Sequence, residues 1–236
     1  MEEYRIAFTL KSDATFGRGE GIAGLIDREV EHDRYGLPYL RGRTLKGLIS
    51  EEADNIFFAL EQMGRLTDDW KKARRVLFGR PGSVAGDSAL LRFGHAELPA
   101  AVREAVIGMS DADSGGNRLR TLATLTTVRR QTAIEAEGER EGVPVEGSLR
   151  AMRVILRETP FEARLLAERP LTPDELGLLA AALLAFRRAG TGRNRGRGRL
   201  AADLRDKDGN SLLQSACDRF AAKALGPIAA APEAQS

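Results

Sequence analysis

The stretch RRAGTGRNRGRGRL, from Arg187 to Leu200, holds six arginines and four glycines. No acidic residue lies between Leu176 and Ala202, so positive charge is concentrated on a flexible segment of backbone. A helix is expected before this stretch and a strand after it, at Arg199–Leu204. The stretch therefore joins two elements inside the fold, which argues against a disordered tail.

The expected helix has strong local signals at its start. Thr172 is placed to cap it, Pro173 suits the first helical position, and Glu175 completes a capping box. An apolar stripe at helical spacing follows, made of Leu176, Leu179, Ala180, Leu183 and Phe186. We expect this helix to run from Thr172 to Arg188 and to end at Gly190.

The rest of the chain supplies strands and helices on either side of two long irregular segments. Strands are expected at Tyr4–Leu10, Ala89–Glu97, Ser148–Leu156 and Thr159–Leu166; one helix is expected from Thr44, as its cap, to Met63, and a shorter one from Thr67–Asp69 to Gly79. This order predicts an α+β fold with a ferredoxin-like (RRM-like) βαββαβ core. Large insertions are expected at about 11–43 and 108–148, the second as an extended segment or hairpin. We expect a single domain over 1–225 and a flexible tail over 226–236.

Composition limits the classes of function. The 236 residues are 42% hydrophobic, which is enough for a real core, and the formal net charge is only +2. A near-neutral total does not indicate a generic polyanion binder, so the local basic clusters carry the information. With one cysteine, Cys217, and two histidines, neither a disulfide nor a structural zinc site is expected.

The chain shows no targeting or membrane signal. The start, MEEYRIAFTL, is acidic and then alternating, unlike a secretory signal. The longest apolar run, LGLLAAALLAF, is about half of what a bilayer requires. We expect a soluble, cytoplasmic protein with no membrane partner.

The Arg187–Leu200 stretch does not fit the common nucleotide motifs. Its glycines follow a helix and are spaced G-x-G-x-x-x-G, and it has no lysine for a Walker A motif. A solvated basic loop remains an alternative. A docking loop for a nucleic-acid backbone is favoured, because arginine forks bind phosphate oxygens and glycines let backbone N–H groups approach phosphates.

These features together resemble the RAMP superfamily of CRISPR-associated proteins, which has a Gly/Arg-rich loop, here Gly190–Gly198, between the last helix and the last strand. A second block, GLIDREVEHDRYGLPYLRGRTLKGLI from Gly24 to Ile49, is similar to the Cas7-type backbone subunits of type III effector complexes. Arg43 stands where that family often has serine. A looser third block resembles the family's thumb hairpin and the strand after it: Arg129–Gln131, Gly147–Arg150 and Phe161–Glu162. The resemblance covers most of Glu3–Leu204.

The resemblance implies a thumb and two RNA-binding edges that hold CRISPR RNA. It also implies three kinds of partner: target RNA, other Cas/RAMP subunits, and copies of the chain itself in a filament. A helix N-terminus with nearby cations is also a ready anion site. The implied RNA-binding residues are Arg41, Arg43, Thr44, Lys46, Arg129, Arg130, Gly192, Arg193, Asn194, Arg195, Gly196 and Arg197.

The resemblance also assigns chemistry to Asp27. In catalytic members of the group, the matching aspartate promotes metal-dependent cleavage of target RNA, so Asp27 would hold Mg²⁺ or another divalent cation, or take the 2′-hydroxyl proton. His32 is a weaker candidate base. Glu29 and Glu31 are expected to be solvated, and His95 to be structural.

Two alternatives to this endoribonuclease remain open. One is a non-catalytic RNA-gripping subunit of the same kind of complex. The other is a Cas6-type endoribonuclease that processes precursor guide RNA.

Overall fold

The computed structural model describes residues 1–19, 21, 26–80, 89–109, 115–132, 143, 145 and 147–226. Gly24 and Leu25 of the second motif block lie outside the described residues, as does the expected tail from residue 227 onward. None of the described helices is long and apolar enough to cross a membrane.

The centre of the fold is a four-stranded antiparallel sheet. Its strands are β1 (Glu2–Leu10), β2 (Leu91–Glu97), β5 (Pro160–Ala167) and β6 (Leu200–Arg205), in the order β2-β5-β1-β6. Ile6, Phe8 and Leu10 alternate with more exposed neighbours on β1, as the period of two predicts. The order and directions are those of a βαββαβ core, which confirms the expected fold class.

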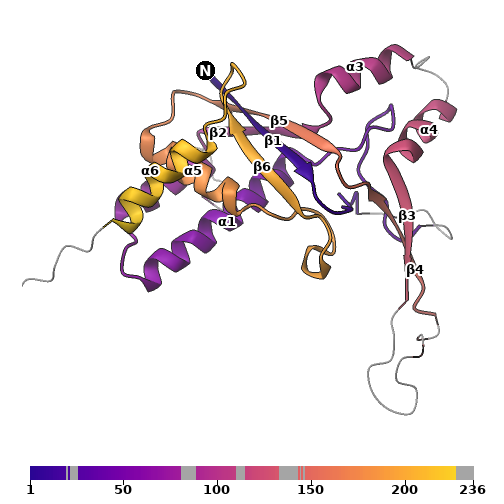
Figure 1. Ribbon diagram of the computed structural model, residues 1–236, viewed down its shortest axis with the longest axis horizontal. Helices are drawn as coiled ribbons and strands as arrows, with labels where there is room; N and C mark the ends of the chain where they lie inside the picture. The colour runs from indigo at the N-terminus through magenta and orange to yellow at the C-terminus, as the bar shows by residue number, and fades with distance from the viewer. Residues whose placement is uncertain are drawn as a thin grey trace, which may run out of the picture.

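The helices that cover this sheet gather on one side of it (Figure 1). They are α1 (Gly42–Gln62), α2 (Asp68–Phe78), α5 (Pro173–Ala185) and α6 (Leu213–Leu225), and α5 contacts the other three. Trp70 of α2 packs on Phe220 of α6 with ring centroids 4.8 Å apart. The helical layer therefore brings together two helices, α2 and α6, that are far apart in the sequence.

Helix α1 begins at Gly42, so the prediction that Thr44 caps it was wrong. Arg41 occupies the cap position, but its side chain does not cap the helix, and the Gly42 N–H donates instead to Nδ1 of His95 on β2, at 2.9 Å. A Cβ at Gly42 would lie 2.3 Å from the Phe93 carbonyl oxygen. Close docking on β2 therefore starts this helix, and His95 has the structural role expected of it.

Helix α5 begins as predicted and ends early. Thr172 and Glu175 form the capping box, but the helix stops at Ala185, and Gly190 is not its terminal glycine. Phe186 turns into the core against Phe8, with ring centroids 6.1 Å apart. Gly190 has φ +90° and faces the Thr15 carbonyl, where a Cβ would approach to 2.5 Å. Packing of Phe186, rather than a glycine, ends the helix.

The segment between β2 and β5 forms a separate arm. It contains α3 (Ala100–Met109), α4 (Gly115–Leu125), β3 (Thr126–Gln131) and β4 (Arg150–Ile155). Strands β3 and β4 form an antiparallel hairpin that leaves the central sheet and projects from the body (Figure 1). Of the two expectations for 108–148, an extended segment or a hairpin, the hairpin is present in the described residues, and Gly115–Leu125 ahead of it is helical.

Candidate nucleic-acid interface

The segment Ser12–Thr15, which follows β1, connects the glycine-rich loop to the hairpin, and we call it the bridging strip. On one side, the Ser12 hydroxyl donates to the Gly196 carbonyl, the Asp13 carbonyl accepts from Gly198 N–H, and the Thr15 carbonyl accepts from Thr191 N–H, at 2.9–3.1 Å. On the other side, Ala14 exchanges two backbone hydrogen bonds with Ile155 of β4, at 2.7 and 3.0 Å. The strip thus places loop and hairpin side by side.

The glycine-rich loop has a defined shape. A single 3-10 turn, Arg193–Arg195, lies between Gly192 (φ +75°) and Gly196 (φ +79°), both left-handed. At Gly198, also left-handed at φ +66°, a Cβ would lie 1.8 Å from the Ala189 carbonyl oxygen. Glycine is therefore required here by both conformation and contact. Hydrogen bonds within the loop, such as Arg195 N–H to the Gly192 carbonyl at 2.8 Å, and those to the bridging strip together order it.

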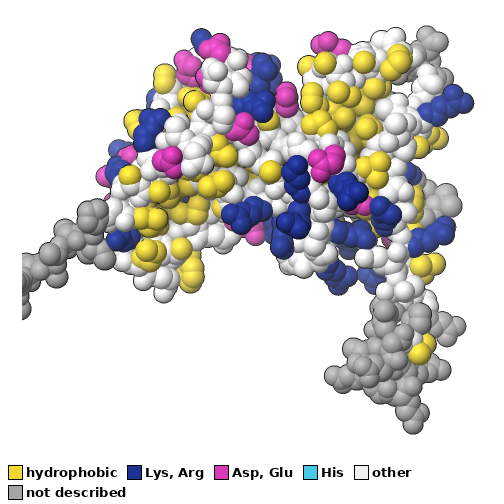
Figure 2. Space-filling model, in the orientation of Figure 1, with side chains coloured by type: hydrophobic (Ala, Val, Ile, Leu, Met, Phe, Trp, Pro, Cys, Tyr) yellow, Lys and Arg dark blue, Asp and Glu magenta, His cyan; other side chains and the backbone are white. Residues whose placement is uncertain are grey.

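A cavity of about 710 Å³ lies between this loop and the hairpin, and we call it the arginine groove. Figure 2 shows Lys and Arg side chains gathered at the centre of the molecule beside the base of the arm. Among the described residues, those lining the groove include no acid; they are Arg28, Gln131, Thr132, Ser148, Arg150, Met152, Gly190, Thr191, Gly192, Arg193, Asn194, Arg195 and Arg197. Five guanidinium groups without a lining carboxylate make a strong anion site.

The loop arginines differ in how firmly they are held. Arg193 makes a forked ion pair with Glu51 of α1, with both N–O distances at 3.0 Å. Arg197 contacts the Met152 sulfur across the groove. Asn194 and Arg195 are exposed at the tip of the turn. The structure therefore brings all six predicted loop residues, Gly192–Arg197, to one place, although the groove lining leaves out Gly196.

A second, smaller cavity of about 240 Å³ adjoins the groove at the N-terminus of α1, and we call it the α1 cavity. It brings Arg41 and Thr44 next to Arg193 of the loop. Arg41 is paired with Glu31 at 2.7 Å, and the Tyr39 hydroxyl donates to the same carboxylate at 2.9 Å. Burial alone would raise the pKa of the Glu31 carboxyl, but these two partners hold the pKa below its usual value. The expectation that Glu31 is solvated was wrong.

Two predicted α1 residues do not line these cavities. Arg43 is exposed on α1, and Lys46 is half-buried on the side of α1 that faces α2. The pKa of Lys46 is lowered, first by burial and then by the nearby positive charge of Arg74 on α2. Arg74 in turn pairs with Asp54 at 2.7 Å. Of the predicted α1 group, the structure therefore places only Arg41 and Thr44 beside the loop.

The two predicted hairpin arginines lie on opposite faces of β3. Arg129 pairs with Asp13 of the bridging strip at 2.9 Å and lines a third cavity, of about 540 Å³, with Lys11, Arg157 and Arg197. Arg130 is exposed on the other face and lines none of the three cavities. The basic surface therefore continues from the arginine groove past Arg197 to Arg129.

Asp27 is held on the hairpin strand rather than on the central sheet. Its N–H donates to the Ala151 carbonyl at 2.8 Å, and one carboxylate oxygen accepts from Ala151 N–H at 2.6 Å. The side chain is otherwise exposed. Its chain neighbour Arg28 and the β4 residue Arg150 both line the arginine groove. Asp27 itself is not a lining residue, so its carboxylate adjoins the groove only through these two neighbours, and one of its oxygens is not bound to Ala151.

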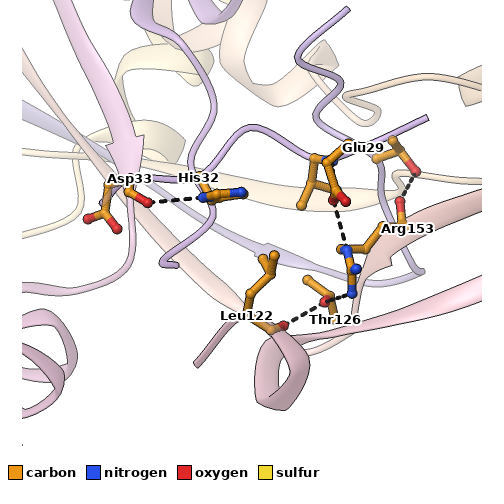
Figure 3. Close-up of polar contacts among 8 residues, drawn as sticks. Glu29, His32, Asp33, Leu122, Thr126 and Arg153 are labelled. Atoms are coloured by element: carbon orange, nitrogen blue, oxygen red, sulfur yellow. Dashed lines mark hydrogen bonds and ion pairs between the residues drawn. The ribbon is translucent and has the colours of Figure 1, made fainter. Parts of the chain in front are cut away.

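The loop after Asp27 is fastened by a buried ion pair. Glu29 and Arg153 of β4 are joined at 2.8 Å, and the Arg153 guanidinium also donates to the Thr126 hydroxyl of β3 at 3.3 Å (Figure 3). Glu29 is 3% exposed, so the expectation that it is solvated was wrong. The pair fixes the position of Asp27, two residues away, relative to the hairpin.

His32 is not brought together with Asp27. Its Nδ1 lies 3.0 Å from the backbone carbonyl oxygen of Asp33 (Figure 3), and it lines none of the three cavities. No group of three or more His, Cys, Asp or Glu side chains among the described residues could hold a metal ion. A single carboxylate such as Asp27 suits an ion that is shared with oxygens of a bound ligand rather than an all-protein cage.

The sequence did not predict eight of the residues that line the groove, which are Arg28, Gln131, Thr132, Ser148, Arg150, Met152, Gly190 and Thr191. Arg28 directly follows Asp27, and Gln131 and Arg150 are opposite each other in the β3–β4 register. Gln131 and Arg150 lie in the third motif block, so a signal was present. The β3–β4 register was needed to show that both side chains lie on the groove side of the hairpin.

Comparison with known proteins agrees with this arrangement. The RAMP superfamily model matches residues 7–201. The chain belongs to the RAMP superfamily. Two chains of solved structures share the fold of this RAMP protein, both from a type III-B Cmr-beta complex. One complex is bound to cognate target RNA: its chain has TM-score 0.58 and 13% identity, over 87% of the RAMP chain and 97% of the other.

The second comparison is with the apo state of that complex. It gives TM-score 0.56 and 14% identity, over 86% of the RAMP chain and 97% of the other. No curated protein matches the sequence. The match of the family model over residues 7–201 confirms the resemblance to RAMP proteins that the sequence showed.

Proposed function

We propose that this RAMP protein is a CRISPR RNA-binding backbone subunit of a type III effector complex and that it cleaves complementary target RNA with the help of Asp27. The observation that carries the first part is the arginine groove, which five guanidinium groups line and no carboxylate lines among the described residues. Membership of the RAMP superfamily and the shared fold with chains of Cmr-beta support the same proposal. The proposed partners are guide RNA, target RNA, other RAMP subunits and further copies of the chain.

The groove suits an RNA backbone rather than a particular base sequence. Arginine forks bind phosphate oxygens in two-point contacts, and the open left-handed backbone at Gly192 and Gly196 leaves room for a phosphate to approach. Contacts of this kind fix the position of a strand without reading its sequence. A guide-binding subunit requires that property, because guides differ in sequence.

Salt dependence tests the binding proposal. Arg193, Arg195 and Arg197 are replaced by alanine together, and affinity for single-stranded RNA is measured across salt concentrations. Each lost phosphate contact should flatten the log–log slope by about 0.7, so the triple variant should lose roughly 2. The matched control is Lys72→Ala, Arg75→Ala and Arg219→Ala, three exposed cations on α2 and α6. A slope that is unchanged in the groove variant would refute the proposal.

For cleavage, the chain supplies a carboxylate beside guanidinium groups. Attack of an RNA 2′-hydroxyl on the adjacent phosphate breaks the bond to the 5′-oxygen, which takes a proton from water, and leaves a 2′,3′-cyclic phosphate. The unbonded oxygen of Asp27 would accept the hydroxyl proton, while Arg28 and Arg150 would stabilise the charge that develops on the phosphate. In the alternative role, Asp27 would instead help to hold a divalent cation shared with the RNA phosphates, which would neutralise the developing charge.

An asparagine substitution separates chemistry from structure at Asp27. Asp27→Asn keeps an oxygen that accepts from Ala151 N–H while it removes the base. In the assembled complex with Mg²⁺, target cleavage at the site served by this subunit should fall by at least about 100-fold with guide binding intact. Asp208→Asn, on an exposed turn, is the control. Undiminished cleavage in Asp27→Asn would contradict the catalytic assignment.

One observation favours the rival, a non-catalytic RNA-gripping subunit. Among the described residues, Asp27 belongs to no group of three or more His, Cys, Asp or Glu side chains that could hold a metal ion. In that case the wild-type complex leaves the target uncut at this position, and the Asp27→Asn variant is indistinguishable from it. Guide binding and its salt dependence are the same under both proposals, so the cleavage assay alone separates them.

A further inference from the structure

The α1 cavity and the arginine groove share a wall. Gly190, Thr191 and Arg193 line both, so the backbone of the glycine-rich loop separates the two spaces. Gly190 is pressed against the bridging strip, where a Cβ would lie 2.5 Å from the Thr15 carbonyl oxygen. A strand that follows the loop arginines therefore passes along the rim of the smaller cavity.

The two spaces differ in chemistry. The described lining of the arginine groove contains no aromatic side chain, whereas the α1 cavity is lined by Tyr39, Leu40 and Leu48 as well as by polar groups. Its volume of about 240 Å³ is below the range of roughly 300–1,000 Å³ that is usual for drug-sized ligands. A small planar ring suits such a space better than a second stretch of charged backbone.

The polar rim of the α1 cavity is fixed in place. The Tyr39 ring lies against His95 with centroids 5.1 Å apart, and its hydroxyl donates to Glu31 at 2.9 Å. Arg41 completes the set with its 2.7 Å contact to Glu31. Both Glu31 oxygens are engaged within the rim, so the exposed Arg41 guanidinium supplies the donors that would meet acceptors on the edge of a nucleobase.

We propose that the α1 cavity takes one nucleobase of the RNA strand whose phosphates lie in the arginine groove. This inference rests on the proposed function, because it needs RNA along the loop. The base leaves the stack of its neighbours, passes over the Gly190–Thr191 wall and packs beside Tyr39. Each subunit would thus hold its strand by phosphates on one side of the loop and by one base on the other.

Filling the cavity without removing charge gives a direct test. Gly17 lines the cavity, and a Cβ there would be 3.4 Å from the Thr191 hydroxyl, so Gly17→Leu adds bulk in the cavity without a severe clash at the Cβ. Gly108→Leu on α3 is the control, since a Cβ there meets nothing within 4 Å. The probes are an oligouridylate and an abasic ribose-phosphate chain of the same length.

The wild-type protein should bind the oligouridylate about tenfold more tightly than the abasic chain. Gly17→Leu should lose most of that preference and keep its affinity for the abasic chain, and Gly108→Leu should behave like wild type. Equal affinity of the wild type for both probes, or a full preference in Gly17→Leu, would overturn the base site. Failure of the proposed function looks different, because the abasic chain would then bind weakly and without salt dependence.

Photocrosslinking gives a second measurement that needs no variant. Oligouridylate that carries 4-thiouridine is irradiated on the wild-type protein, and the crosslinked peptides are identified by mass spectrometry. Crosslinks within the segment from Tyr39 to Leu48 are expected. Crosslinks confined to Gln131 and Arg150–Met152 would place every base in the arginine groove and reject the proposal.

Discussion

Glu29 Oε1 lies 2.8 Å from Arg153 Nε, and their side chains are only 3% and 16% exposed. The two residues are 124 positions apart and join the Asp27 loop to the hairpin. The same Glu29 oxygen accepts from Val30 N–H at 2.9 Å. A buried, hydrogen-bonded charge pair therefore fixes the geometry around the proposed catalytic carboxylate.

Removing one partner of this pair should be costly. Glu29→Leu leaves the Arg153 charge buried without its carboxylate, and we expect the free energy of unfolding to fall by about 3 kcal/mol. The double variant with Arg153→Met should recover most of that loss, since both charges are then gone. Urea denaturation followed by circular dichroism measures both. A double variant no more stable than Glu29→Leu would show that the two charges do not act as a pair.

Two glycines of the loop should respond differently to the same substitution. Gly196→Ala places a Cβ in open space at φ +79°, so only backbone strain applies, about 1 kcal/mol. Gly198→Ala adds a Cβ 1.8 Å from the Ala189 oxygen and should cost about 3 kcal/mol. Melting temperatures compare them, at roughly 2–4 °C for each kcal/mol. Equal shifts would mean that the Ala189 contact relaxes freely.

Lys46 and Arg195 provide a contrast between two predicted RNA contacts. Arg195→Ala should flatten the salt dependence of RNA binding by about 0.7 in log–log slope, because this exposed side chain lines the arginine groove. Lys46→Ala should leave the slope unchanged, because Lys46 faces Arg74 and α2. Filter binding over a salt series measures both variants. A flatter slope for Lys46→Ala would place RNA on the α2 side of α1.

Acid should weaken the start of α5 through Glu175. Hydrogen bonds from Arg169, at 2.6 and 2.7 Å, hold the pKa of the buried Glu175 carboxyl below its usual value. A lowered folded-state pKa adds stability that is full above the unfolded-state pKa of about 4.3 and disappears as pH falls through the folded-state value.

Wild type should therefore exceed Glu175→Gln by about 2 kcal/mol at neutral pH, with the gap closing in acid. Unfolding free energies measured from pH 7 to pH 3 test this. A gap that stays constant over that range would show that ionisation of Glu175 does not contribute.

Sequence alone predicted the features that depend on near neighbours. The capping box at Thr172 and Glu175 involves residues three apart, and the alternation on β1 follows directly from the strand period. The βαββαβ order followed from these local elements. The position of the loop between α5 and β6 was correct for the same reason.

What the sequence could not show depends on partners far along the chain. Glu29 and Glu31 read as solvated because their acid-rich neighbourhood does not reveal Arg153 or the geometry of Arg41. The start of α1 at Gly42 is set by His95, 53 residues later. Helix periodicity places Lys46 on α1 but does not say that α2 covers that side.

The bridging strip determines the width of the arginine groove. Both sides of the arginine groove are hydrogen-bonded to this strip. The glycine-rich loop bonds to Ser12, Asp13 and Thr15. The hairpin bonds to Ala14 and to the Thr15 hydroxyl, which donates to the Arg153 carbonyl at 2.9 Å. Lengthening or shortening the bridging strip by one residue would change the distance between the loop and the hairpin without altering a single arginine. The width of the arginine groove is therefore set by residues that carry almost none of its charge.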